Sequence, residues 1–174
     1  MIERGELDED AWCELVDGEV ICLQSPPWYH ASVVMAVALT LGNFAREIGA
    51  LLLSESAGFI VGDKHQQVRQ PDLSLVSKER LRILPAGQRL ATDAPDLAVE
   101  VLSGDQHTEA YAKRKVAEYF AAGSRVVWLV DSDSRTVRVY EAGRAEYSVY
   151  SGEAQVNLEA IAPGFSVSIA SFFP

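Results

Sequence analysis

The sequence has few cysteines, few basic residues and no cluster of glycines. Its two cysteines, Cys13 and Cys22, are too few for a disulfide-based scaffold. They flank Asp17-Gly18 and could form one bridge, but we expect two reduced thiols because the N-terminus has no secretory signal. The dispersed glycines exclude a phosphate-binding loop, and no dinucleotide-binding fingerprint follows a strand.

The deficit of basic residues limits the classes of function. Fifteen lysines and arginines stand against 25 aspartates and glutamates, a net charge of −10. This balance excludes a protein that coats nucleic acid by bulk positive charge, but not a nuclease whose basic groups cluster locally. Lys64 with Arg69, and Lys113-Arg114, could form such a contact patch. No apolar run reaches the roughly 18 residues that cross a bilayer. We therefore expect a cytoplasmic protein with no membrane partner.

The remaining composition and the hydrophobic pattern predict one α/β domain over residues 1–174. Hydrophobic residues make up 48% of the chain, enough for a core. Asp17-Gly18 between two apolar runs predicts an N-terminal hairpin. Apolar residues at three- and four-residue steps predict helices over 29–47, ending at Gly49, and over about 108–122. Strands are predicted at 51–61, 72–77, 96–102, 125–131 and 136–140. This order predicts a mixed sheet flanked by helices, with N- and C-terminal hairpins.

Glu100 is the most unusual residue of the predicted strands. Strand alternation places Ala98 and Leu102 on its face, while the other face is also apolar. A strand that is apolar on both faces is normally buried in a sheet. A buried, unpaired carboxylate is unfavourable by several kcal/mol. Glu100 therefore either has a cation, a hydrogen-bond set or a metal as its partner, or lies near a strand end and reaches water.

Asp72 and Lys115 each have a plain interpretation and a catalytic one. Asp72 follows Pro71 at a strand start, where aspartate commonly caps a turn. Lys115 lies in line with Tyr119 beside the apolar helix face, where a lysine can also extend into water. Together with Glu100 they suit phosphodiester hydrolysis. Two carboxylates bind Mg²⁺ or Mn²⁺, the cation activates a water, and the lysine offsets charge developing on the phosphate.

Several segments resemble the Uma-two family, which groups restriction-endonuclease-like proteins of the PD-(D/E)xK nuclease superfamily. The main matches are residues 70–76, 94–103 and 115–123, with further matches at 14–19, at Glu55 with 58–59, and at 125–131. The resemblance covers nearly the whole chain, from about residue 10 to Phe165. It implies a restriction-endonuclease-like fold and a metal-dependent endonuclease that acts on nucleic acid, above all DNA, as a homodimer.

The resemblance also implies roles for single residues. Asp72 matches the PD aspartate and Glu100 the second carboxylate, with the carbonyl of Val101 as the third metal ligand. The superfamily's usual lysine position is occupied by Leu102, and Lys115 on the following helix matches the family's replacement. Glu14 matches an early family glutamate, although a strand-end glutamate beside a turn is the plainer account.

Departures from the family pattern keep a second hypothesis open. Many relatives carry an aspartate shortly before the helical lysine, where this chain has no acidic residue over 110–112. Asp105 or Glu109 could substitute, or the function could be absent. The alternative is a catalytically silent nuclease-fold module that serves dimerisation or partner binding. His30 is interpreted as a structural or pocket-edge residue that opens the first long helix.

Overall fold

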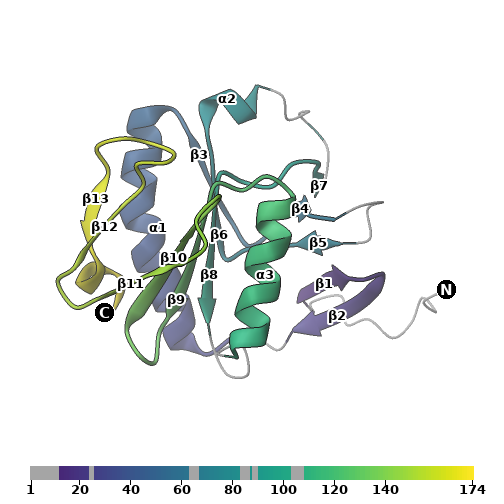
Figure 1. The fold of residues 1–174 in the computed structure, drawn as a ribbon, viewed down its shortest axis with the longest axis horizontal. Coiled ribbons are helices and arrows are strands. Elements are labelled where there is room, and N and C mark those ends of the chain that lie inside the picture. Colours follow the sequence, from purple (N-terminus) through teal and green to yellow (C-terminus); the bar gives the residue numbers. More distant parts are fainter. Residues whose placement is uncertain (1–11, 24–25, 63–66, 83–86, 88–89, 103–107) are drawn as a thin grey trace.

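The computed structural model describes residues 12–23, 26–62, 67–82, 87, 90–102 and 108–174. Its centre is a six-stranded sheet in the order β11-β10-β9-β8-β6-β3, in which β8 and β9 are parallel and the other neighbours antiparallel (Figure 1). The strands are β3 (Leu51–Ser54), β6 (Leu73–Val76), β8 (Leu97–Leu102), β9 (Val126–Asp131), β10 (Thr136–Glu141) and β11 (Ser148–Ser151).

Two helices cover opposite faces of this sheet (Figure 1). α1 (Trp28–Ile48) packs on the face that carries Leu97, Val99 and Val101 of β8, and α3 (Glu109–Ala121) packs on the face of Ala98 and Leu102. Strand alternation therefore directs Glu100 toward α3. This arrangement confirms the predicted mixed α/β sheet and both predicted long helices.

A second sheet lies beside the first and contains the N-terminal hairpin. Its order is β2-β1-β5-β4-β7. The strands are β1 (Trp12–Val16), β2 (Glu19–Leu23), β4 (Gly58–Ile60), β5 (Val68–Arg69) and β7 (Leu90–Ala91). The remaining elements are α2 (Lys78–Leu81), β12 (Gln155–Asn157), β13 (Ser166–Ser168) and the 3₁₀ helix η3 (Ile169–Phe172).

Local sequence explains how the main elements begin and end. Asp17 and Gly18 both have positive φ, 51° and 83°, as a two-residue hairpin turn of this kind requires. Gly49 ends α1 in the left-handed region at φ 69°, and its N–H caps the carbonyls of the last turn. Thr108 caps α3 by accepting a hydrogen bond from the N–H of Tyr111. The first two of these signals were predicted from the sequence.

The strand predicted over 51–61 differs from the structure. It divides into β3 and β4, which belong to different sheets, because a turn closed by Ala57 N–H and the Ser54 carbonyl separates them. Two further strands of the second sheet, β5 and β7, have two residues each. Strands so short leave no alternation in a sequence, so β5 and β7 could not be predicted from it.

The cysteine expectation was wrong. Cys13 is disulfide-bonded, and the register of β1 and β2 places it directly opposite Cys22. Reduced thiols are therefore not what the structure shows.

The sequence was expected to contain no apolar segment long enough to cross a membrane, and α1 differs from that expectation. By length and composition it could cross a bilayer, and it is the helix in the described part of the chain that meets this test. Its inner face nevertheless packs on the sheet through Val33, Val37, Leu41 and Ala45. A helix that covers a buried sheet needs the same apolar composition.

Candidate active site

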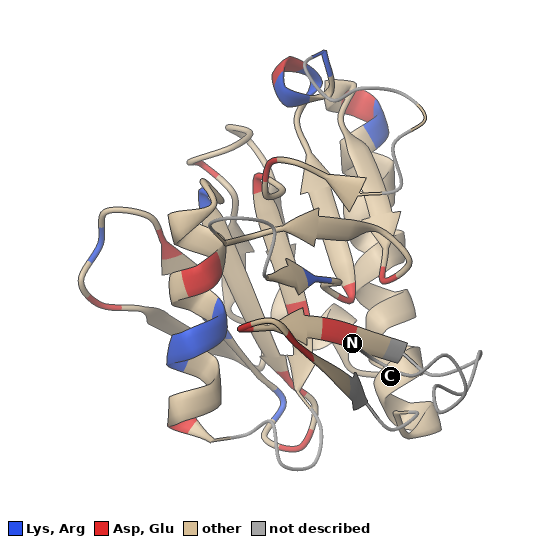
Figure 2. Cartoon of the chain, turned by 90° about the vertical axis from the view of Figure 1, so that its right-hand side faces the viewer, with Lys and Arg blue, Asp and Glu red and all other residues tan. Residues whose placement is uncertain are grey.

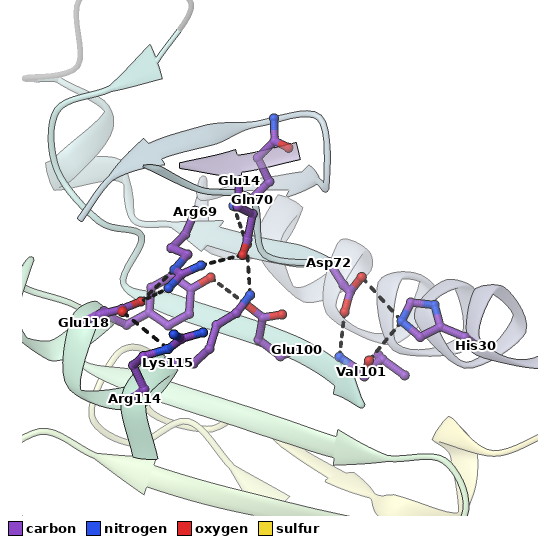
Figure 3. A network of polar contacts seen from close by, with 11 residues as sticks. Glu14, His30, Arg69, Gln70, Asp72, Glu100, Val101, Arg114, Lys115 and Glu118 are labelled. Carbon is purple, nitrogen blue, oxygen red and sulfur yellow. Dashed lines mark hydrogen bonds and ion pairs between the residues drawn. The ribbon is translucent and has the colours of Figure 1, made fainter. Parts of the chain in front are cut away.

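Five segments supply polar side chains in two bonded groups, which adjoin at the neighbouring residues Glu100 and Val101 of β8 (Figure 3). Glu14 comes from β1, His30 from the first turn of α1, Asp72 from the residue before β6, Glu100 from β8 and Lys115 from α3. The network lies where the second sheet meets the α3 face of the first. The three residues predicted to be catalytic, Asp72, Glu100 and Lys115, are among them.

Lys115 binds Glu100 inside the protein. Its side chain is buried, and Nζ lies 3.0 Å from Glu100 Oε1. Tyr119, one helical turn later, donates its hydroxyl to the same oxygen at 2.5 Å. The plain interpretations, a solvated Lys115 and a Glu100 that reaches water, were therefore both wrong. Glu100 has a cation and a hydrogen-bond set as partners, which is what a buried carboxylate requires.

Glu14 is part of the network, although the sequence favoured a plain strand-end role. It is central in β1, opposite Ile21, and its side chain is 6% exposed. Lys115 Nζ lies 2.9 Å from Glu14 Oε1, so one ammonium bridges Glu14 and Glu100. The residues are far apart in sequence, and no pattern in either segment signals the contact.

Arg69 continues the network behind Glu14. The sequence suggested it, with Lys64, as a local basic contact patch; Lys64 lies outside the described residues, and Arg69 is buried, so Arg69 does not form such a patch. Its guanidinium is buried and donates to Glu14 Oε2 at 2.6 Å and, through Nε, to Glu118 Oε2 at 2.6 Å. Glu118 lies on α3 and also faces the guanidinium of Arg114, at 3.9 Å. The ion pairs of Arg69 with Glu14 and Glu118 hold β5 and β1 against α3.

The electrostatics of the cluster follow from this burial. Desolvation raises the pKa of Glu100 to about 7, and the nearby Asp72 and Glu14 add to the rise, while Lys115 and Tyr119 oppose it. Burial would also raise the pKa of Glu14, but Lys115 and Arg69 outweigh it and leave that pKa below its ordinary value. Burial would lower the pKa of Lys115, but Glu100 and Glu14 outweigh it. Lys115 therefore stays charged at neutral pH.

Asp72 organises the end of the sheet. The β6–β8 register pairs Leu73 with Val99, and one step further Asp72 Oδ2 accepts the N–H of Val101 at 2.6 Å. His30 Nε2 donates to the Val101 carbonyl at 2.9 Å and lies 3.6 Å from Asp72 Oδ1. Burial would lower the pKa of His30, but Asp72 and the Val101 carbonyl outweigh it and raise that pKa. The interpretation of His30 as a structural, pocket-edge residue agrees with this geometry.

The donor chemistry of the site fits a hard divalent cation. Asp72, Glu100 and the Val101 carbonyl supply oxygen atoms, the donors that Mg²⁺ and Mn²⁺ take. Asp72 and Glu100 are close enough for one to raise the pKa of the other, a repulsion that a cation would relieve. Within the described residues, no three or more His, Cys, Asp and Glu side chains form a preformed metal-binding group. The third donor would have to be the backbone carbonyl.

The positions proposed to replace the missing family aspartate do not add to the site. Glu109 is exposed and faces Lys113 and Arg138, both at 3.5 Å, on the outside of α3. Asp105 lies outside the described residues. Lys113 and Arg114 do not form a free basic patch, because Glu109 and Glu118 pair with them; Figure 2 shows the basic band of α3 between acidic positions.

A pocket of about 200 Å³ opens beside Asp72. It is lined by Pro26, His30, Ala31, Val34, Met35, Glu55 and Asp72. We call it the α1 pocket, since α1 contributes four of these residues. It shares His30 and Asp72 with the polar network.

Comparison with known proteins places the chain in a family. The model of the Uma2 family, described as "Putative restriction endonuclease", matches residues 3–170. The chain belongs to the Uma2 family. The fold of this Uma2 protein is similar to that of a crystal structure titled "a putative nuclease belonging to DUF820" from Anabaena variabilis, with a TM-score of 0.79 and 22% identity over 92% of this chain and 89% of that one. No curated protein sequence matches the chain.

These matches confirm the resemblance and the nuclease-type fold stated from the sequence. They do not test the residues of the site, its metal or its substrate. The geometry above brings together all of the residues that the resemblance implied, and adds Arg69, Glu118 and Tyr119. Tyr119 alone had a signal in the sequence, since it lies four residues after Lys115 on the same helix face.

Proposed function

We propose that this Uma2 protein is a metal-dependent endonuclease that hydrolyses phosphodiester bonds of DNA. The observation that carries the proposal is the position of Lys115, a buried, charged lysine held between Glu14 and Glu100. A charged lysine and two carboxylates around one point form a combination that suits phosphodiester hydrolysis. Membership of a restriction-endonuclease family supports the reaction class.

The chain's own residues would act as follows. Asp72, Glu100 and the Val101 carbonyl would hold Mg²⁺ or Mn²⁺, which when bound polarises a phosphate oxygen and lowers the pKa of a water. Tyr119 and Lys115 keep one Glu100 oxygen oriented through their hydrogen bonds. The ammonium of Lys115 would neutralise charge that develops on the phosphate during attack. Arg69 holds Glu14, and Glu14 in turn holds Lys115.

A second candidate is a catalytically silent module of nuclease fold. The observation in its favour is that Lys115 is already engaged by two carboxylates and that the Val101 carbonyl already accepts from His30. In such a module the network would only stabilise the junction of the two sheets. The net charge of −10 also fits a protein whose partner is not nucleic acid.

The homodimer implied by the fold remains part of the proposal. Leu39, on the outer face of α1, is 67% exposed, and the helix has no Asp, Glu, Lys or Arg over residues 28–45. Two copies of a chain with net charge −10 repel each other less where one uncharged face meets another. This supports a homodimer in which the outer face of α1 packs against a second copy of the chain.

Cleavage assays with matched variants test the reaction. We expect the wild-type protein to cleave single- or double-stranded DNA with Mn²⁺ or Mg²⁺ and not with chelator. Asp72→Asn keeps an oxygen acceptor for Val101 N–H but removes the charge, and Glu100→Gln and Lys115→Gln remove one charge each. We expect each to lower the rate at least ~100-fold.

Lys113→Gln is the control, since Lys113 lies on the same helix with an exposed side chain. It should cleave like the wild type, with circular dichroism confirming the fold of every variant. Equal rates in all the variants would point to a contaminating nuclease and contradict the proposal. Cleavage by none of the proteins, together with no Mn²⁺ binding by calorimetry, would favour the silent module.

A further inference from the structure

The α1 pocket has no role in the hydrolysis described above. It lies against the reacting centre, because Asp72 is a wall of the pocket and a proposed metal ligand. A ligand bound there would lie next to a phosphate held at Asp72 and Glu100. The pocket is therefore in a position to hold a part of the substrate.

The walls of the pocket suit one small ring system. Pro26, Ala31, Val34 and Met35 make most of the lining apolar. Sites for small molecules combine such walls with a few convergent polar groups, and commonly have about 300–1,000 Å³ for drug-sized ligands. A volume of about 200 Å³ is smaller than that range and leaves room for less than a whole drug-sized ligand. A single nucleobase meets this requirement.

The polar groups of the pocket accept hydrogen bonds and carry negative charge. Glu55 is half-buried, and no hydrogen bond or ion pair joins it to any other residue in the described part of the chain. Asp72 is the second carboxylate, and the Nε2 proton of His30 is already given to the Val101 carbonyl. Carboxylates accept hydrogen bonds and repel phosphate. The pocket therefore disfavours an anionic group, and a neutral ligand must donate hydrogen bonds to it.

Exocyclic amino groups of nucleobases provide such donors. Cytosine, adenine and guanine carry one, whereas thymine does not, and a glutamate that accepts from cytosine N4 is a known pairing. The edge and faces of a base are accessible in this way only when it is unpaired and unstacked. A base inside a duplex could not enter the pocket.

We propose that the α1 pocket binds an unpaired, amino-bearing nucleobase (cytosine, adenine or guanine) of the nucleotide beside the scissile phosphate, with Glu55 as the acceptor of its amino group. This inference rests on the proposed function and names its substrate class: single-stranded or locally unpaired nucleic acid rather than intact duplex. Glu55 is then a specificity-determining residue and takes no part in the hydrolysis.

Binding measured without cleavage tests the inference separately from the reaction. The Glu100→Gln protein serves as the cleavage-blocked background, and the probes are fluorescein-labelled single strands made only of cytosine or only of thymine, with fluorescence anisotropy as the readout. We expect the cytosine strand to bind about 10-fold more tightly than the thymine strand. Adding Glu55→Gln should reduce this ratio to near 1, because the glutamine amide offers both a donor and an acceptor.

Two further variants complete the design. Ala31→Phe, at an exposed helical position in the lining, should fill the pocket and lower binding of the cytosine strand to the level of the thymine strand. Glu47→Gln removes an exposed carboxylate at the far end of α1 and should leave the ratio unchanged. Thermal unfolding of each variant confirms that it is folded.

Several results would overturn the inference. These are equal binding of both strands, binding of neither, and a cytosine preference that survives both Glu55→Gln and Ala31→Phe. A Glu55→Gln variant that loses Mn²⁺ affinity in calorimetry while keeping the base preference would make Glu55 part of a cation site instead. Failure of the proposed function looks different, since it is an absence of metal-dependent cleavage by the wild-type protein whatever strand binds.

Discussion

Tyr119 and Glu100 are joined by a 2.5 Å hydrogen bond between the phenol and one carboxylate oxygen. Both side chains are buried, so the bond is made without competition from water. It stabilises the charged form of Glu100 and lowers a pKa that burial otherwise raises. The tyrosine therefore positions the carboxylate that is proposed to bind the metal.

Removing this hydroxyl should weaken the site without destroying the fold. For Tyr119→Phe we expect the free energy of unfolding to fall by about 1–2 kcal/mol, the range for losing one hydrogen bond to a buried group. Mn²⁺ affinity should also fall, because the carboxylate becomes harder to ionise. Urea denaturation and calorimetry measure the two effects. Mn²⁺ affinity equal to that of the wild type would show that the phenol does not position Glu100.

The buried ion pairs of Arg69 should contribute more to the free energy of unfolding than the ion pair of an exposed arginine. Arg69→Met removes the buried guanidinium that pairs with both Glu14 and Glu118, and breaking a buried pair in this way costs about 3–5 kcal/mol. Arg114→Met is the control, since Arg114 is half-exposed and 3.9 Å from Glu118, and its loss should cost less than ~1 kcal/mol. Equal losses in urea denaturation would mean that the buried network does not hold α3 in place.

The metal-free protein should show a pH dependence of stability that comes from Glu100. Its folded pKa is about 7, above the ordinary value of 4.5, so the folded state binds the proton more tightly than the unfolded chain does. Its contribution is fully present below pH 4.5 and is lost as the pH rises toward 7. In chelator, the Tm of Glu100→Gln should therefore rise relative to the wild-type Tm across this window. A constant difference would contradict the shift.

The outer face of α1 offers a test of the homodimer. We expect sedimentation to give a dimer for the wild type and a monomer for Leu39→Lys, because a charge is introduced into an uncharged face. Ser151→Lys, an exposed position on the edge strand β11, should remain dimeric. A dimer in all three proteins would place the contact elsewhere.

The sequence by itself determined the local structure and the central site residues. Alternation along β8 fixed that Glu100 faces away from Val99 and Val101, and helical spacing placed Lys115 and Tyr119 on one line. Both outcomes depend only on neighbours within one element, so a pattern of a few residues contains them. The turn at Asp17-Gly18 and the end of α1 at Gly49 are local in the same sense.

Only the tertiary structure decided what the charged residues do. The sequence pattern predicts Lys115 at the edge of the core, yet its side chain is buried. The reason is that β1 places Glu14, which lies 101 positions earlier in the chain, over it. Arg69 lies in a two-residue strand that leaves no periodicity, and its partners come from β1 and α3. Ion pairs between distant segments depend on how sheets and helices pack, and hydrophobic patterning does not encode which charges then meet.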